Sequence, residues 1–185
     1  MLEDETGTTD DWALIASAIC ATPPPGLERV SATSPLNSTN KSVSVSCPAG
    51  KRVFGAGADI NTFNGQVILD DLRPNAALTS VTANGLEDET GNPAPWSVTA
   101  YAVCANSIAG LERISETGPL DTNGFKVLFP NCTGGKVLTG IGADINTFNG
   151  QVQLGALDVG GIETSSSARR WTRPATRRPG ASPAT

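Results

Sequence analysis

Eleven consecutive residues of this chain occur twice without a single difference. The segment Gly-Ala-Asp-Ile-Asn-Thr-Phe-Asn-Gly-Gln-Val spans residues 57–67 and returns at residues 142–152. Looser matches at nearly the same spacing surround it: 2–7 with 86–91, 12–21 with 96–105, and 26–29 with 110–113. Self-similarity at a fixed period indicates a duplicated structural unit. The chain is therefore constrained to fold as two related repeats.

The second repeat is shorter than the first. Its correspondence stops after Ser165, so it lacks a counterpart of residues 81–105, yet the chain begins with much of that missing piece. We predict four segments: 1–21, an N-terminal strand that completes the second repeat; 22–105, the first β repeat; 106–165, the second β repeat; and 166–185, a disordered Arg/Pro-rich tail. Because the chain opens in the middle of a repeat, we expect a fragment whose leader lies upstream.

The local pattern predicts strands. Residues 41–46 and 96–103 alternate apolar and polar side chains with period two, as half-buried strands do. Residues 53–60 and 137–145 are apolar runs spaced by Gly and Ala, typical of tightly packed strands. We predict an all-β fold of two tandem antiparallel repeats, each a small sandwich or prism-like unit, with Trp12 and Trp96 as equivalent core residues.

An Asn-Gly pair lies inside each copy of the duplicated segment, at residues 64–65 and 149–150. Asn-Gly supplies the positive φ angles that a type I′ hairpin turn needs. The first interpretation of the duplicated segment is therefore a hairpin that sets the register between two strands.

Charge is divided unevenly along the chain. The chain has 18 acidic and 13 basic residues, and five of the basic ones are arginines after Ala168, where no acid occurs. The remaining part is strongly acidic and would repel a phosphate backbone, so we expect no nucleic-acid binding by the repeats. The tail is poor in apolar residues, which is typical of disorder. No apolar run reaches membrane-spanning length, so membrane insertion is not expected.

Four cysteines recur at equivalent places in the repeats, and the chain has no histidine and no Cys-x-x-Cys motif. This argues against zinc sites and favours two disulfides in an oxidising compartment. Two pairings fit the repeat. Local pairing joins Cys20 to Cys47 and Cys104 to Cys132. Crossed pairing joins Cys47 to Cys104 and Cys20 to Cys132; we favour it because it also explains why the chain starts with the piece that the second repeat lacks.

Residues 47–58 (CPAGKRVFGAGA) and 96–105 (WSVTAYAVCA) resemble the tandem "CPAGK…W-x-V-T-A-Y-A-x-C-A" repeat modules of predicted secreted actinobacterial proteins. The resemblance implies an exported, disulfide-bonded β module and carries no functional residues with it. The second copy departs from the motif at residues 132–136 (CTGGK). A fainter similarity, at residues 47–50 and 70–71, is to the β-prism of vitelline membrane outer layer proteins, and it bears on fold alone.

Catalytic chemistry has little support in the residues. Without histidine there is no Ser-His-Asp or Cys-His arrangement. One remote alternative is a glycoside hydrolase in which Asp59 or Asp144 acts with Asp70 and Asp71 as a carboxylate pair. Asp70 and Asp71 are replaced by Gly and Ala in the second copy, and adjacent acids at a strand end are usually solvated. We do not expect an enzyme.

No cofactor is expected, and calcium could bind only weakly. The spacing of oxygen ligands after Asp59 does not fit an EF-hand loop, since Phe63 stands where a ligand is needed. Residues 86–91 (LEDETG) concentrate three acids in one loop, copied at 2–7, but a solvated acidic turn is the simpler interpretation.

Two functions of a secreted or cell-surface protein remain. In one, the chain is a non-enzymatic binding module for carbohydrate or a surface protein, because amides can bond sugar hydroxyls and an aromatic ring can stack on a sugar. The candidate ligand-binding residues are Asp59, Asn61, Phe63 and Asn64 in the first copy, and Asp144, Asn146, Phe148 and Asn149 in the second. In the other, the repeats are structural spacers or assembly units of a cell envelope or surface appendage.

Overall fold

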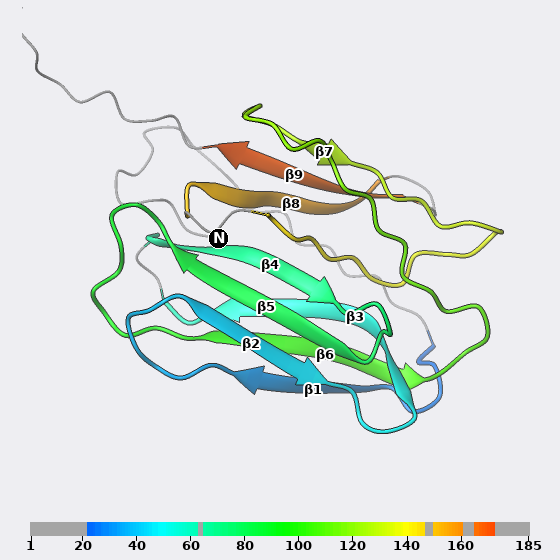
Figure 1. Ribbon diagram of the computed structural model, residues 1–185. Helices are drawn as coiled ribbons and strands as arrows, with labels where there is room; N and C mark the ends of the chain where they lie inside the picture. The colour runs from blue at the N-terminus through cyan, green and yellow to red at the C-terminus, as the bar shows by residue number, and fades with distance from the viewer. Residues whose placement is uncertain (1–21, 63–64, 147–149, 161–164, 173–185) are drawn as a thin grey trace, which may run out of the picture.

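The computed structural model describes residues 22–62, 65–146, 150–160 and 165–172. Their secondary structure consists of β-strands without any helix, which confirms the predicted all-β class (Figure 1). The strands are β1 (Glu28–Thr33), β2 (Lys41–Ser46), β3 (Lys51–Ile60), β4 (Val67–Pro74), β5 (Ser80–Glu87), β6 (Val98–Asn106), β7 (Val127–Leu128), β8 (Val152–Gly160) and β9 (Ser165–Thr172). Within the described residues, no helix has the length and hydrophobicity that crossing a membrane requires.

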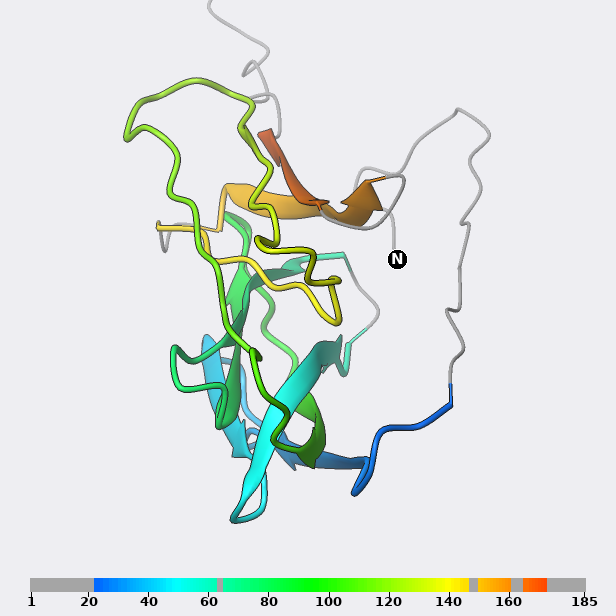
Figure 2. The same cartoon turned by 90° about the vertical axis from the view of Figure 1, so that its right-hand side faces the viewer.

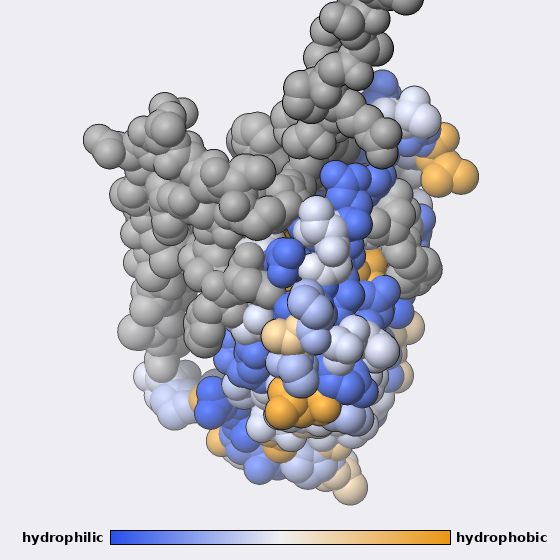
Figure 3. Space-filling model, turned by 90° about the vertical axis from the view of Figure 1, so that its left-hand side faces the viewer, coloured by the Kyte–Doolittle hydropathy of each residue, from blue (hydrophilic) through white to orange (hydrophobic). Residues whose placement is uncertain are grey.

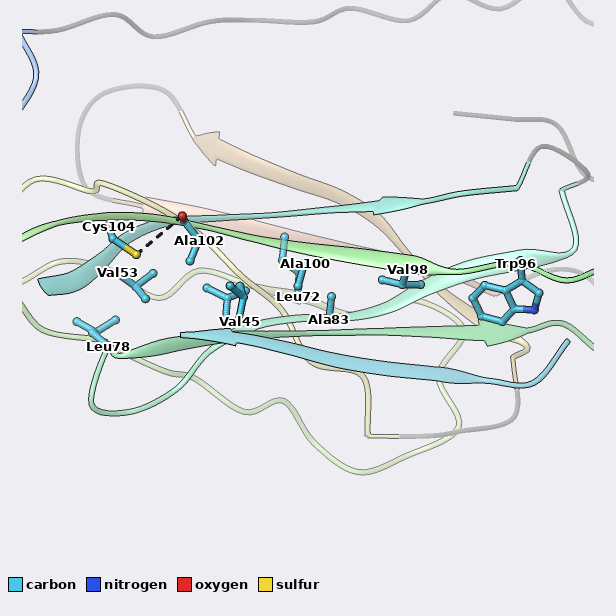
Figure 4. Close-up of a cluster of buried hydrophobic side chains, with 11 residues drawn as sticks. Val45, Val53, Leu72, Leu78, Ala83, Trp96, Val98, Ala100, Ala102 and Cys104 are labelled. Carbon is cyan, nitrogen blue, oxygen red and sulfur yellow. Dashed lines mark hydrogen bonds between the residues drawn. The ribbon is translucent and has the colours of Figure 1, made fainter. Parts of the chain in front are cut away.

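The first six strands form a sandwich of two antiparallel sheets, ordered β1-β6-β3 and β2-β5-β4. Its core lies between them (Figure 4). Along β6, every second side chain is fully buried: Val98, Ala100, Ala102 and Cys104. They face Val45, Val81 and Ala83 of the opposite sheet. The small alanines allow the two sheets to approach closely, as in other aligned sandwiches.

Trp96 fills one end of this core and is fully buried, as predicted. Gly85 on β5 makes room for it. A Cβ atom at Gly85 would lie 2.8 Å from the Trp96 ring and 2.7 Å from Val98 Cγ2, so only glycine fits there. Trp12, its predicted equivalent, lies outside the described residues.

The predicted hairpin around Asn64-Gly65 is wrong. β3 pairs with β6 and β4 pairs with β5, so the segment between β3 and β4 passes from one sheet to the other instead of joining two paired strands. Gly65 does have the expected positive φ, +75°. A local turn signal predicts a change of direction, but it does not determine which strands pair, because pairing depends on the edges offered by distant strands.

Three strands of the second copy form a separate sheet, ordered β7-β9-β8, beyond β4 (Figure 1). This sheet is the counterpart of β2-β5-β4. In the first copy Val67 pairs with Glu87 and Val43 with Ala83. Their repeat mates in the second copy pair in the same way, Val152 with Thr172 and Leu128 with Ala168. The bulge between Leu69 and Asp71 also recurs, between Leu154 and Ala156.

This sheet extends into the segment predicted to be a tail, residues 166–185. The composition predicts disorder from residue 166 onward, whereas residues 166–172 belong to β9. At the aligned positions the sequence of β9 (SSSARRWT) shares only Ser165 and Ala168 with that of β5 (SVTANGLE). Backbone hydrogen bonds between strands do not depend on side-chain identity, so the open edges of β7 and β8 can pair with a segment that lacks an apolar pattern. Residues 173–185 lie outside the described part of the chain.

A second correction concerns residues 137–145, predicted to be a strand like residues 53–60. The first-copy segment is β3, whereas the second-copy segment forms only an isolated bridge between Ala143 and Leu72. Figure 2 shows much of the chain from 107 to 146 running without regular strands beside the sandwich. The physical reason is the absence of a partner, because β3 is held by β6 and no described residue of the second copy takes the place of β6.

The disulfide between Cys47 and Cys104 is formed, with an S–S distance of 1.98 Å and 5.7 Å between the Cα atoms. It agrees with the crossed pairing and links the connection after β2 to the central strand of the other sheet. Among the described residues Cys132 has no disulfide partner. Cys20 lies outside them, so its predicted bond to Cys132 stays a prediction.

Candidate functional site

The first copy of the duplicated segment places Asp59 and Asn61 at the end of β3. Asp59 is exposed. Asn61 is tied to the sheet: its backbone N–H donates to the carbonyl of Ser97 at 2.8 Å, and its side-chain Nδ2 donates to Ser97 Oγ at 3.0 Å and Thr99 Oγ1 at 3.3 Å. The donors of the Asn61 amide are therefore used inside the molecule. Phe63 and Asn64 lie outside the described residues.

The second copy has different surroundings. Ala143 exchanges two backbone hydrogen bonds with Leu72, of 2.8 and 2.9 Å, so the segment covers the free edge of β4. Asp144 forms an ion pair with Arg73 of β4. Asn146 is exposed, and Phe148 and Asn149 lie outside the described residues. Identical sequences thus make different contacts in the two copies.

The Asp70-Asp71 pair is buried, which corrects the expectation of solvated acids at a strand end. Asp70 is fully buried and Asp71 is 1% exposed. Two consecutive side chains can both be buried here because the β-bulge between Leu69 and Asp71 interrupts the alternation of β4. The chain from Ala143 to Ile145 then covers this edge. Neither the bulge nor a cover from a distant segment is visible in the local sequence.

Asp71 is the centre of a small polar cluster. Its Oδ2 accepts a hydrogen bond of 2.6 Å from Asn84 Nδ2, and its Oδ1 accepts one of 3.1 Å from the Ile145 backbone N–H. Burial raises the pKa of the Asp71 carboxyl, and the charge and hydrogen bond of Asp144 raise it further, while the Ile145 amide and Arg73 act in the opposite direction. The pKa of Asp71 is raised overall, so its carboxyl keeps a proton to a higher pH than an ordinary Asp does.

This cluster brings together two residues of the predicted carboxylate pair, but not in a glycosidase arrangement. Glycoside hydrolases hold their two carboxyl groups about 5 to 9.5 Å apart, with the sugar between them. Asp71 and Asp144 are in direct hydrogen-bond contact, and Asp71 is buried, so no sugar fits between them. Asp59, the other candidate, stands on the opposite sheet.

The acidic loop after β5 does not gather its carboxylates. Asp88, only 8% exposed, caps the turn: its Oδ1 accepts from the backbone N–H groups of Thr90 at 2.9 Å and Gly91 at 3.1 Å. Glu87 Oε1 accepts from the indole N–H of Trp96 at 2.8 Å, and Glu89 accepts from Gln151 at 3.1 Å. Among the residues described, no group of three or more acidic or cysteine side chains is placed to hold a metal ion.

The contact of the Lys41 ammonium group with the ring of Trp96 was not predicted from the sequence. Lys41, the first residue of β2, is 5% exposed and places its ammonium group 4.1 Å from the centre of the Trp96 ring. Burial lowers the pKa of Lys41, and the charge of Glu87 partly offsets this. The Lys41 ammonium also donates to Asn37 Oδ1 at 2.7 Å and to the Asn37 carbonyl at 3.0 Å. Lys41 is the first residue of a strand that alternates polar and apolar side chains, and nothing in the local sequence indicated that it would be buried.

Comparison with protein-family models, curated proteins and solved structures gives no match to this chain. Its function must therefore be inferred from the geometry of its own residues.

Proposed function

We propose that this chain is a non-enzymatic extracellular surface module that serves as a structural repeat, a spacer or assembly unit. The observation that supports this most strongly is the unequal use of the duplicated segment. In the first copy Asn61 bonds to Ser97 and to Thr99 of β6, and in the second Ala143 and Asp144 bond to β4. Asn61 and Asp144 are both exposed, but they bond to different partners in the two copies. Two equivalent ligand sites would need the same contacts in both copies.

An extracellular location is supported by the disulfide between Cys47 and Cys104. Such bonds persist in oxidising compartments and are rare where thiols are kept reduced. The bond also suits a spacer, since a covalent link between the two sheets resists their separation.

The surface gives a further argument for a spacer. On the face in Figure 3, hydrophobic side chains of the described residues occur as separate spots among hydrophilic ones. Specific binding sites are usually concave and mostly apolar, with a few polar groups for orientation. This face, as far as it is described, has no such continuous apolar area.

Carbohydrate binding is the second candidate, because the candidate Asp and Asn are exposed in both copies: Asp59, Asn61, Asp144 and Asn146. A glycan array probed with the whole chain separates the two functions. A spacer predicts no saturable glycan binding by the wild type. It also predicts that Asn61→Ala lowers the free energy of unfolding by about 1 kcal/mol through its lost hydrogen bonds, while Asn146→Ala leaves it unchanged.

Ser42→Ala, on the exposed side of β2, is the matched control for stability. The proposal would be overturned by saturable retention of a glycan that Asn146→Ala, Phe63→Ala and Phe148→Ala each weaken while Ser42→Ala does not.

A further inference from the structure

The second copy contains the parts of a sandwich without its central strand. Its sheet β7-β9-β8 reproduces β2-β5-β4 in strand order and register. In the first copy the opposite sheet is built around β6, since β1 and β3 both pair with β6 and not with each other. The segments equivalent to β1 and β3, residues 112–117 and 136–145, are both present in the second copy, but neither forms a strand.

One ion pair of the β1-β6-β3 sheet of the first copy is also present in the second copy. In the first copy Lys51 of β3 forms an ion pair with Glu28 of β1, reaching across the end of β6. Their repeat mates Lys136 and Glu112 form the same ion pair, with 2.8 Å between Nζ and Oε1. The two flanking segments are thus held together at the position where a central strand would lie between them.

Hydrophobic side chains around this position are exposed. Val30 of β1 packs against the core, whereas its repeat mate Ile114 is 39% exposed. Of the eight large hydrophobic residues found exposed in the described part of the chain, six lie in the stretch from Ile108 to Val137. A strand added here would cover Ile114, whose repeat mate Val30 packs against the core of the first copy.

The N-terminal segment has the sequence of this missing strand. The fully buried residues at alternate positions of the first copy are Trp96, Val98, Ala100, Ala102 and Cys104. Their repeat mates near the start of the chain, at the same alternate positions, are Trp12, Leu14, Ala16, Ala18 and Cys20. The segment therefore keeps the bulky end, the small middle and the cysteine.

The last strand of the second copy and the N-terminal segment also meet at consecutive positions of the repeat. The second copy runs in register as far as Thr172, the mate of Glu87. The N-terminal segment continues the repeat at Asp4, the mate of Asp88. Joined in this order, the two pieces give one complete repeat unit.

The described chain starts close to the end of β6, where the second copy begins. The carbonyl of Pro25 accepts a hydrogen bond of 3.0 Å from the N–H of Asn106, at the end of β6. Four residues later, a Cβ at Gly110 would be 3.5 Å from the Lys136 side chain, close after Cys132. The five residues from Cys20 to Pro25 span up to roughly 17 Å when extended, so Cys20 is not confined to the immediate surroundings of Pro25.

We infer that residues 12–21 of this same chain dock between residues 112–117 and 136–145 as the central strand of the second sandwich, with Cys20 bonded to Cys132. Bond formation joins the two sulfurs, releases two protons and transfers two electrons to a disulfide oxidant such as oxidised glutathione. The inference extends the proposed structural role, since it makes the chain a closed two-sandwich unit.

The test uses the full chain, oxidised with the glutathione couple. Non-reducing peptide mapping should give a Cys20–Cys132 peptide from material that light scattering shows to be monomeric. Amide hydrogen exchange should be slow in residues 112–117 and 136–145. Both properties should be lost in Ala18→Asp, whose mate Ala102 is fully buried, and kept in Ser17→Asp, whose mate Tyr101 is half-buried.

A further variant lacking residues 1–21 should lose the slow exchange in both segments and keep the Cys47–Cys104 bond. A Cys20–Cys132 bond found only between chains in oligomers would overturn the inference, and so would equal exchange in Ala18→Asp and Ser17→Asp. Neither result depends on ligand binding, so the inference and the proposed function can fail separately.

Discussion

Asp71 is an acidic residue whose burial disfavours its own negatively charged form. Its carboxyl is 1% exposed, next to Asp144, and its pKa is raised above the ordinary value of 3.8. The folded protein therefore binds this proton more tightly than the unfolded chain does. By linkage, the stability that the proton contributes is fully present below the unfolded pKa and is lost as the pH rises through the raised folded pKa.

Asp71→Asn should remove this pH dependence. The amide can still accept from Ile145 and donate toward Asp144, and Asn84 can turn its Oδ1, which has no partner among the described residues, toward the new amide. We expect the difference in unfolding free energy between wild type and variant to shift in favour of the variant as the pH rises from about 4 toward neutral. Urea titrations at several pH values measure it.

Asp59→Asn is the control, since Asp59 is exposed. A difference between wild type and Asp71→Asn that stays constant over this range would contradict the raised pKa of the buried Asp71 carboxyl. Asp71→Ala should cost about 1 to 3 kcal/mol at every pH, because it leaves the Ile145 and Asn84 donors without an acceptor.

At the scale of single elements, the chain from Gly142 to Ile145 covers the edge of β4 only because glycine allows a close approach. A Cβ at Gly142 would lie 2.3 Å from the Leu72 carbonyl oxygen and 2.8 Å from Pro74 Cδ. Its repeat mate Gly57, in the identical sequence, has its nearest neighbour at 3.8 Å, the Tyr101 Cβ. The two glycines thus form a matched pair for experiment.

Gly142→Ala should break the bridge between Ala143 and Leu72 at a cost of about 1 to 3 kcal/mol, the usual range for overpacking. Gly57→Ala should be close to neutral. Hydrogen exchange of the Leu72 and Ala143 amides gives the direct measurement, with faster exchange expected in Gly142→Ala alone. Equal effects of the two substitutions would show that the two copies have the same surroundings.

Sequence patterns predicted the elements whose signal is local. The alternation at Lys41–Ser46 gave β2, and the repeat placed Trp96 in the core. Patterns failed where the outcome depends on a distant partner. Residues 53–60 became β3 because β6 pairs with them, whereas the similar run at 137–145 has no such partner among the described residues.

At the candidate site too, the sequence pointed to individual residues but not to the contacts they make with distant segments. Asp144 and Asp71 were singled out as carboxylates, and the structure brings them together. The contact between the buried Asp71 and the exposed Asp144 depends on a bulge in β4 and on a covering segment from the other copy, as the Ile145–Asp71 hydrogen bond shows. The burial of Lys41 over Trp96 depends likewise on the packing of two sheets.

At the scale of the whole molecule, the Cys47–Cys104 bond should dominate the stability of the first sandwich. The two cysteines are 57 residues apart, and closing a loop of that length constrains the unfolded chain by about 4 kcal/mol in the chain-entropy model. The double variant Cys47→Ala/Cys104→Ala should lose roughly this amount in urea unfolding. Cys132→Ala should leave the unfolding of the first sandwich unchanged, and an equal loss in that variant would contradict the assignment.

The central place of β6 has a consequence for synthesis on the ribosome. β1 and β3 have no hydrogen-bonded partner in their sheet except β6, which ends at Asn106. β1 and β3 can therefore complete their sheet only after β6 has been synthesised. Pairing between strands that are distant in sequence is also slow. Until then the apolar faces of β1 and β3 stay open to other chains, as unpaired strand edges do in partly folded proteins. This topology makes the nascent chain most vulnerable to aggregation just before β6 emerges.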